Sequence, residues 1–170
     1  MTALTVLVLA MGLADVESGP KKDAAESALK VQFVTGTHEG KEVDFPAERK
    51  GEVTVYLFVS SDKFARPVGR FIKELDNKLA ETNDKAVAAA VWFGGDAEKT
   101  KDYIPKVQGA FKTTKTDFGY LTTATPEGWG LNTDAHLTVV VTKDKKVVKT
   151  LAFVSVNDAD VPKVLAAIKK

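Results

Sequence analysis

The hydrophobic pattern is clearest over residues 53–79, where a continuous apolar run is followed by a helical one. Val53–Val59 is almost entirely apolar and rich in Val, Tyr and Phe, which is typical of a β-strand buried on both faces. After a short polar loop, apolar residues recur at helical spacing at Val68, Phe71, Ile72, Leu75 and Leu79. This spacing predicts an amphipathic helix whose charged residues, Asp76 among them, are turned towards solvent. We therefore expect a buried strand, a tight turn and a helix packed back against the sheet.

Other apolar runs predict the remaining strands and helices. Further strands are predicted at Val31–Thr35, Val43–Phe45 (ended by Pro46), Ala86–Phe93, Leu137–Val141 and Val147–Val154. Asp96 is suited to cap a helix from Ala97, in which Tyr103, Ile104, Val107 and Phe111 face inward. Pro105 is expected to kink or split that helix. A last helix has the inner stripe Val161, Val164, Leu165 and Ile168, whereas Ala47–Gly51 reads as a charged turn and Lys112–Gly130 as a long loop.

The amino-terminal residues 1–14, MTALTVLVLAMGLA, are apolar, uncharged and end in small residues that a signal peptidase accepts. We therefore expect a signal peptide and an exported protein, periplasmic or extracellular. No basic residue precedes the apolar run, so a first buried strand of a cytoplasmic protein is the alternative. The segment is shorter than the roughly 20 residues of a helical span, so no integral membrane span is expected. Asp15–Lys30 is polar and charged, which predicts a linker or a frayed helix over Asp23–Leu29.

The composition limits the kinds of function. The 170 residues include 24 basic and 23 acidic side chains, and this balance argues against a nucleic-acid partner. There is no cysteine, which excludes disulfides, thiol catalysis, zinc–thiolate sites and iron–sulfur clusters. The two histidines, His38 and His136, lie far apart and lack the spacing of metal ligands, so we expect no metal and no other cofactor.

The predicted order is strand, strand, helix, strand, helix, strand, strand, helix, and it resembles the layout of thioredoxin-like proteins. In that family the first core strand leads to an aromatic residue and then to Cys-Gly-Pro-Cys at the start of a helix. Here Phe64 is followed by Ala65-Arg66-Pro67-Val68 and the amphipathic helix, so Ala65 and Val68 stand where the two cysteines would be. Family members also carry a cis-proline before the final hairpin, and Ala135 or His136 takes that place here.

The resemblance covers residues 31–170 and implies an α/β fold. The expected architecture is a thioredoxin-like three-layer sandwich, with a central mixed β-sheet and helices on both faces. The chain is also similar to cysteine-poor, thioredoxin-like proteins that bacteria export. Because thiol–disulfide exchange requires a thiolate, a chain without cysteine can be neither a thiol–disulfide oxidoreductase nor a thiol peroxidase.

The place of the missing active site is the candidate binding site. Its predicted residues, here called the relic active-site face, are Ser61, Asp62, Phe64, Ala65, Arg66, Pro67, Trp129 and His136. We expect a non-catalytic domain that binds another protein or a peptide there, as a binding or scaffold module. The alternative is a non-redox enzyme or an anion-binding protein that uses the helix start at Ala65–Val68, with Arg66 and His136 as its principal groups.

Three of these residues, and the nearby Tyr120, have an alternative explanation that needs no ligand. Trp129 and Tyr120 form the rim of a peptide site or pack their own loop down. His136 binds a ligand or is a half-buried residue in place of the lost proline. Arg66 holds an anion or is simply solvated. Their contacts in the folded chain distinguish these alternatives.

Overall fold

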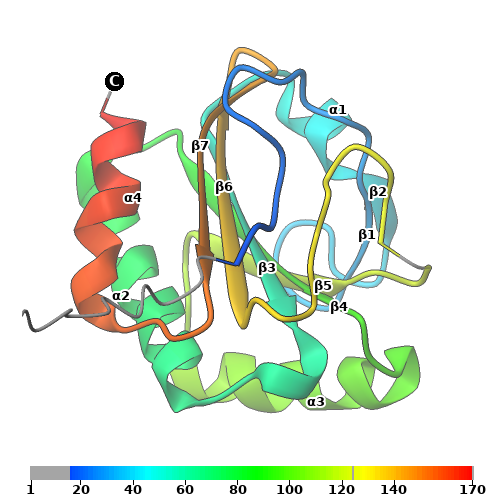
Figure 1. The fold of residues 1–170 in the computed structure, drawn as a ribbon. Helices are drawn as coiled ribbons and strands as arrows, with labels where there is room; N and C mark the ends of the chain where they lie inside the picture. Colours follow the sequence, from blue (N-terminus) through cyan, green and yellow to red (C-terminus); the bar gives the residue numbers. More distant parts are fainter. Residues whose placement is uncertain (1–15, 124, 170) are drawn as a thin grey trace, which may run out of the picture.

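A seven-stranded mixed β-sheet runs through the centre of the protein, seen in a computed structural model that describes residues 16–123 and 125–169 (Figure 1). The predicted signal peptide lies outside these residues. The strands are β1 (Lys30–Phe33), β2 (Glu42–Asp44), β3 (Thr54–Ser60), β4 (Val87–Phe93), β5 (Thr116–Tyr120), β6 (Leu137–Lys143) and β7 (Lys146–Phe153). The helices are α1 (Phe45–Arg49), α2 (Arg66–Thr82), α3 (Ala97–Phe111) and α4 (Val161–Ile168), with short 3-10 turns η1 (Ser61–Lys63) and η2 (Asp158–Asp160).

The strand order is β2-β1-β5-β4-β3-β6-β7, which places β3 near the middle of the sheet. β3 pairs in parallel with β4 along its whole length and antiparallel with β6. All seven of its residues are buried, as the continuous apolar run predicts. In the part of the chain that the structure describes, no helix is both long enough and apolar enough to cross a membrane.

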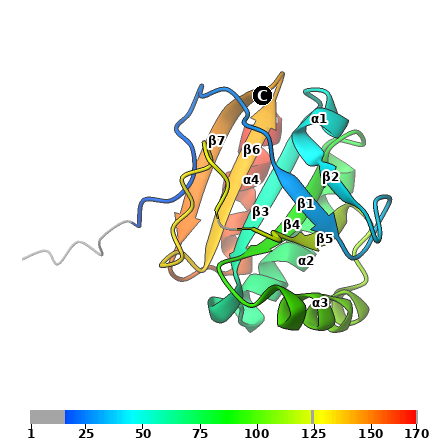
Figure 2. The same cartoon turned by 90° about the vertical axis from the view of Figure 1, so that its right-hand side faces the viewer.

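Two hydrophobic cores lie on opposite faces of the sheet. Val55, Leu57 and Val59 point from β3 into the core that α2, α3 and α4 cover. Tyr56 and Phe58 point into the other core, which α1, the chain before β1 and the loop before β6 cover (Figure 2). The alternation of side chains along β3 therefore divides the sandwich into its layers.

Two predicted loops contain regular structure. The expected charged turn over Ala47–Gly51 is wrong, because α1 begins at Phe45, with Pro46 in its first turn where a missing N–H costs little. The expected long loop over Lys112–Gly130 is also wrong, because it contains β5. Gly119 explains this strand, since a Cβ atom at this position would lie 2.5 Å from Val31 Cγ1 and 2.8 Å from Gln32 O. A glycine in a strand marks such a close approach of neighbouring backbone.

The helix that contains Pro105 is not split. α3 continues from Ala97 to Phe111 as one helix, with Asp96 as its cap: the Asp96 side chain accepts a hydrogen bond from the Lys99 N–H. Ile104 and Val107 are buried as predicted, but Tyr103 is 44% exposed and does not face the core. Tyr103 is therefore a surface aromatic residue.

The segment before β1 crosses the second face of the sheet as irregular, extended chain, and no helix forms over Asp23–Leu29. Glu26 anchors it, because its Oε1 atom accepts hydrogen bonds from the Tyr56 hydroxyl at 2.7 Å and from Thr142 Oγ1 at 2.8 Å. Ser18 Oγ also lies 2.6 Å from Thr138 Oγ1. Burial and the Glu26 carboxylate raise the pKa of Tyr56 above its ordinary value, so its hydroxyl stays protonated.

Asp76 is a correction to the amphipathic pattern of α2. It was expected to face solvent, but it is only 1% exposed. Its carboxylate accepts hydrogen bonds from the Lys115 N–H at 2.8 Å and from the Thr114 N–H at 3.0 and 3.2 Å. These two backbone groups directly precede β5, so α2 fixes the point at which β5 enters the sheet.

We predict that Asp76→Ala lowers the free energy of unfolding by about 2–3 kcal/mol, because two backbone N–H groups lose their acceptor. Asp76→Asn keeps one acceptor oxygen and is expected to cost less. Urea unfolding followed by circular dichroism measures both. An equal loss for the two variants would contradict a role as hydrogen-bond acceptor.

Candidate functional site

The relic active-site face lies where the parallel strands β3 and β4 end. In α/β proteins ligands commonly bind outside the carboxyl ends of parallel strands. The chain leading into β6 lies beside this end: Ser60 Oγ donates to Thr133 O at 3.2 Å, and Ser60 N–H donates to His136 O at 3.3 Å. Lys63 Nζ forms an ion pair with Asp134 Oδ1 at 3.4 Å. The end of β3 and η1 therefore lie beside the segment 133–136.

The loop after β4 also lies close to this face. Gly94 has φ of 77°, in the left-handed region that favours glycine. A Cβ atom on Gly95 would lie 2.5 Å from Ser61 Cβ, so only a glycine allows the loop to approach η1 this closely.

The start of α2 carries the residues that stand where cysteines would be. Ala65, Arg66 and Pro67 are exposed, whereas Val68 is 1% exposed and packs in the core. Ala65 is the N-cap residue but offers no side-chain cap, and the first turn holds no acidic residue. The first turn of α2 is therefore an exposed, electropositive end of a 17-residue helix.

Two predicted site residues have structural roles. Trp129 is 1% exposed, lies 4.9 Å from the Tyr56 ring and donates from Nε1 to Ala28 O at 3.1 Å. It belongs to the core on the opposite face of the sheet, so it packs its own loop down and forms no rim. His136 is half-buried, and its N–H donates to Phe153 O of β7 at 2.7 Å, directly before β6 begins. No peptide bond among the described residues is cis.

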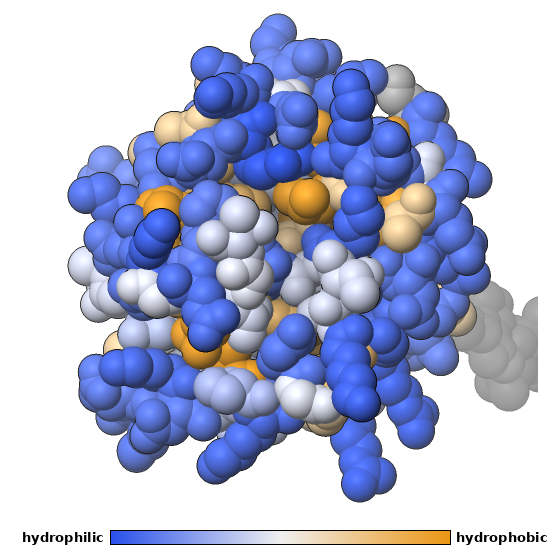
Figure 3. Space-filling model, turned by 180° about the vertical axis from the view of Figure 1, so that it is seen from behind, coloured by the Kyte–Doolittle hydropathy of each residue, from blue (hydrophilic) through white to orange (hydrophobic). Residues whose placement is uncertain are grey.

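The surface has little exposed hydrophobic area outside small hollows. Seen from behind, it is largely hydrophilic, with hydrophobic residues in separate spots (Figure 3). Among the described residues, Tyr103 and Val154 are the large hydrophobic side chains that are exposed. Tyr103 lies next to the relic active-site face, because its ring centroid is 5.9 Å from that of Phe64.

Tyr103 separates two hollows. One, of about 210 Å³, has mostly polar or charged residues in its lining, which consists of Ser61, Asp62, Trp92, Asp96, Lys99, Thr100 and Tyr103. The other, of about 230 Å³, is mainly apolar and is lined by Phe64, Ala65, Arg66, Tyr103, Lys106, Val107, Ala110 and Phe111. The two hollows extend the site from α2 onto α3, which the sequence did not indicate.

In the first hollow, one carboxylate already accepts a backbone hydrogen bond. The Lys99 N–H donates to Asp96 at 3.0 Å, and this hydrogen bond lowers the pKa of the Asp96 carboxyl. Trp92 is buried below, and its Nε1 atom has no hydrogen-bond partner among the described residues. Those residues also hold no group of three His, Cys, Asp or Glu side chains that would suit a metal ion.

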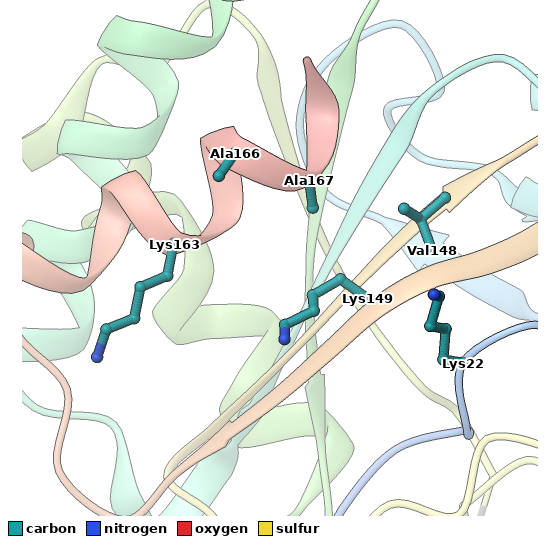
Figure 4. A pocket seen from close by; sticks show the side chains of 6 residues that line it. All are labelled: Lys22, Val148, Lys149, Lys163, Ala166 and Ala167. Carbon is teal, nitrogen blue, oxygen red and sulfur yellow. The ribbon is translucent and has the colours of Figure 1, made fainter. Parts of the chain in front are cut away.

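A further groove lies between α4 and β7 and shares no residue with the relic active-site face. It is lined by Lys22, Val148, Lys149, Lys163, Ala166 and Ala167 and has a volume of about 310 Å³ (Figure 4). Lys163 Nζ is already paired with Asp160 at 2.6 Å, which lowers the pKa of the Asp160 carboxyl.

The contribution of α3 is the part of the site that sequence reasoning missed. Ile104, Val107 and Phe111 define the inner stripe, and Tyr103 precedes it by one position. An aromatic residue at the border of a stripe is the signal that would have placed Tyr103 at the surface.

No protein-family model and no curated protein sequence matches the chain. Solved structures match its fold. BsSco, of the Sco family of cytochrome c oxidase assembly proteins, is 15% identical with a TM-score of 0.59, over 91% of this chain and 99% of that one. Peroxidoxin BcpB from Mycobacterium tuberculosis is 13% identical with a TM-score of 0.61, over 88% and 97%. The exposed lipoprotein thioredoxin Etrx1 from Streptococcus pneumoniae strain TIGR4 is 15% identical with a TM-score of 0.56, over 82% and 98%.

These comparisons confirm the thioredoxin-like fold predicted from the sequence: an α/β protein with a mixed central sheet and helices on both faces. They concern the fold alone, because sequence identity is low. This chain differs from a thiol-active protein of the same fold by having no cysteine.

We predict that the double variant Ala65→Cys, Val68→Cys forms an internal disulfide. Ala65 is the N-cap of α2 and Val68 is its third helical residue, which is the spacing of the Cys-Gly-Pro-Cys motif at a helix start. A disulfide needs Cβ atoms about 3.5–4.5 Å apart, and we expect these two positions to reach that distance after small adjustments. Thiol titration and intact mass, before and after reduction, count the free thiols. Ala65→Cys, Arg70→Cys is the control and is expected to keep two free thiols, since these positions do not face each other. Two free thiols in the first variant would show that the register with the Cys-Gly-Pro-Cys motif is wrong.

Proposed function

We propose that this thioredoxin-like domain is an exported protein-binding or scaffold module that holds its partner at the relic active-site face and carries out no thiol chemistry. Trp129 is left out of that face because it is buried in the core. The observation that supports the proposal most is the exposure of Ala65, Arg66 and Pro67 at the start of α2, in a chain that has no thiol to offer a substrate.

The geometry of the face favours binding. Hydrogen bonds from Ser60 and the Lys63–Asp134 ion pair join its two segments. A surface that is already ordered loses little conformational entropy when a partner docks. Phe64 and Arg66 also provide an aromatic ring and a guanidinium group, which are enriched among the residues that dominate interfaces.

Export is proposed from the sequence of residues 1–14, which has the apolar run and small terminal residues of a signal peptide. A partner would then be sought in the cell envelope or outside the cell.

We predict that purified protein retains a specific partner from the native envelope fraction, and that Phe64→Ala, Arg66→Ala, His136→Ala retains it at least about tenfold less. Loss of two or three central contacts commonly costs more than the roughly 1.4 kcal/mol that corresponds to tenfold. Affinity capture followed by quantitative mass spectrometry measures the difference.

The matched control is Glu81→Ala, Asp84→Ala, which changes exposed residues at the far end of α2. It is expected to retain the partner like the unaltered protein. If the triple variant captures the same proteins in the same amounts, the relic active-site face is not the functional surface.

Anion binding at the start of α2 is the second candidate. It is favoured by the exposed Arg66 in a first turn that has neither a side-chain cap nor an acidic residue. The hollow that Arg66 lines does not include His136, so this candidate rests mainly on Arg66.

For this candidate, phosphate is predicted to raise the melting temperature more than chloride at equal ionic strength, because a ligand that binds only the folded state stabilises it. Arg66→Ala should remove the difference, whereas Arg70→Ala, which changes an exposed arginine one turn later, should keep it. Scanning fluorimetry measures these shifts. Equal shifts in both salts would argue against a specific anion site.

A further inference from the structure

We infer that the apolar hollow between α2 and α3, here called the α2–α3 groove, receives an acidic peptide segment that carries one large apolar side chain. This inference rests on the proposed function and narrows it to a class of partner. The groove is lined by Phe64, Ala65, Arg66, Tyr103, Lys106, Val107, Ala110 and Phe111.

The size and lining of the groove suit a single side chain. Its volume of about 230 Å³ is below the roughly 300–1,000 Å³ of sites that enclose whole small molecules. Phe64 and Phe111 supply aromatic walls, and Val107 and Ala110 add aliphatic surface. A groove of this kind accepts an anchor residue from a larger partner more readily than a free metabolite.

The position of Tyr103 is the second observation that supports a bound side chain in this groove. It is 44% exposed, although its ring packs edge-on against Phe64 with an interplanar angle of 74°. Tyrosine combines a large apolar ring with a polar tip, and it is enriched with arginine at the energetic centres of interfaces. Tyr103 and Arg66 both line the groove, so a docked side chain would contact both.

The charge of the groove indicates which charge its partner should carry. Its charged side chains are Arg66 and Lys106, and no carboxylate lines it. Neither of them forms an ion pair within the described residues. Arg66 also lies in the first turn of α2, where the helix dipole adds positive potential. Carboxylates that flank the apolar anchor therefore complement this site.

The groove between α4 and β7 provides an internal comparison, since it too combines lysines with an apolar floor (Figure 4). It contains no aromatic residue, and Lys163 is already paired with Asp160. An acidic segment with an apolar anchor should therefore prefer the α2–α3 groove. If charge alone governed binding, the acidic segment would bind to both grooves with similar affinity.

Fluorescence anisotropy with three labelled pentapeptides tests this inference on the full chain at low ionic strength. The peptides are Asp-Glu-Phe-Asp-Glu, the same peptide with Ser in place of Phe, and Lys-Lys-Phe-Lys-Lys. The first is expected to bind with a Kd of about 0.1–1 mM, and the other two at least about tenfold more weakly. Added salt should weaken the first peptide, because exposed charges are screened.

Variants locate the site. Lys106→Glu is expected to weaken the first peptide about tenfold, since it places a like charge against the peptide, and Tyr103→Ser about fivefold. Lys149→Glu makes the same change of charge in the α4–β7 groove and should leave the Kd within about twofold. All three residues are exposed, and matching melting curves show that the variants remain folded.

The inference is overturned if the first peptide does not bind at millimolar concentration, if the Ser peptide binds equally well, or if Lys149→Glu weakens binding as much as Lys106→Glu. Lys106 and Tyr103 lie outside the relic active-site face, so this result is separable from the proposed function. A partner that is lost by Phe64→Ala, Arg66→Ala, His136→Ala but retained by Lys106→Glu and Tyr103→Ser would refute the groove and leave the binding face intact.

Discussion

The double pairing of β3 is the constraint on which the rest of the structure depends. β3 is hydrogen-bonded to β4 on one side and to β6 on the other, and both of its faces are buried. A shift of its register by one residue would turn Tyr56 and Phe58 towards α2. The second core would then receive the smaller side chains Val55, Leu57 and Val59. The strand is therefore fixed in place, and so are the segments that leave the sheet beside its carboxyl end. The relic active-site face is therefore ordered because it is attached to this strand.

That face is suited to recognition because its order does not depend on reactive groups. Thiol chemistry would require a sulfur atom at the start of α2, and the chain has none. What remains is an exposed helix end with a positive potential, an aromatic residue before it, and neighbouring loops held by Ser60, Lys63 and Gly95. Such a surface can bind through shape and charge without any covalent step. On the proposed function, the sheet would supply a rigid platform, and side chains of α3 would contribute to the choice of partner.

The sequence predicted the central strands and α2 because their hydrophobic periods are long and unambiguous. The strand–turn–helix order also predicts the sharp connection from β3 to α2, and the structure has it in η1 and the N-cap Ala65. It failed where tertiary contacts overrule local pattern. β5 is short and partly polar, and it exists because Gly119 lets β1 approach closely. Asp76 is buried because distant backbone N–H groups need an acceptor, and Trp129 is buried because β3 offers Tyr56 and Phe58 to pack on. The groups that Asp76 and Trp129 contact lie far away in the sequence, so a local pattern does not reveal them.

The α2–α3 groove shows the same principle at the site itself. Its end is formed by Phe111, which packs directly over Gly69 of α2, where a Cβ atom would collide with the Phe111 ring. Glycine inside a helix costs about 1 kcal/mol relative to alanine, so its presence calls for a compensating contact. Here the compensation is the close approach of α3, which brings Tyr103 and Lys106 to the start of α2. Gly69 thus leaves room for the Phe111 ring at the end of α3 that lies over α2. A periodic pattern along α2 gives no indication of this, because Gly69 lies between two residues of its apolar stripe and has no side chain to classify.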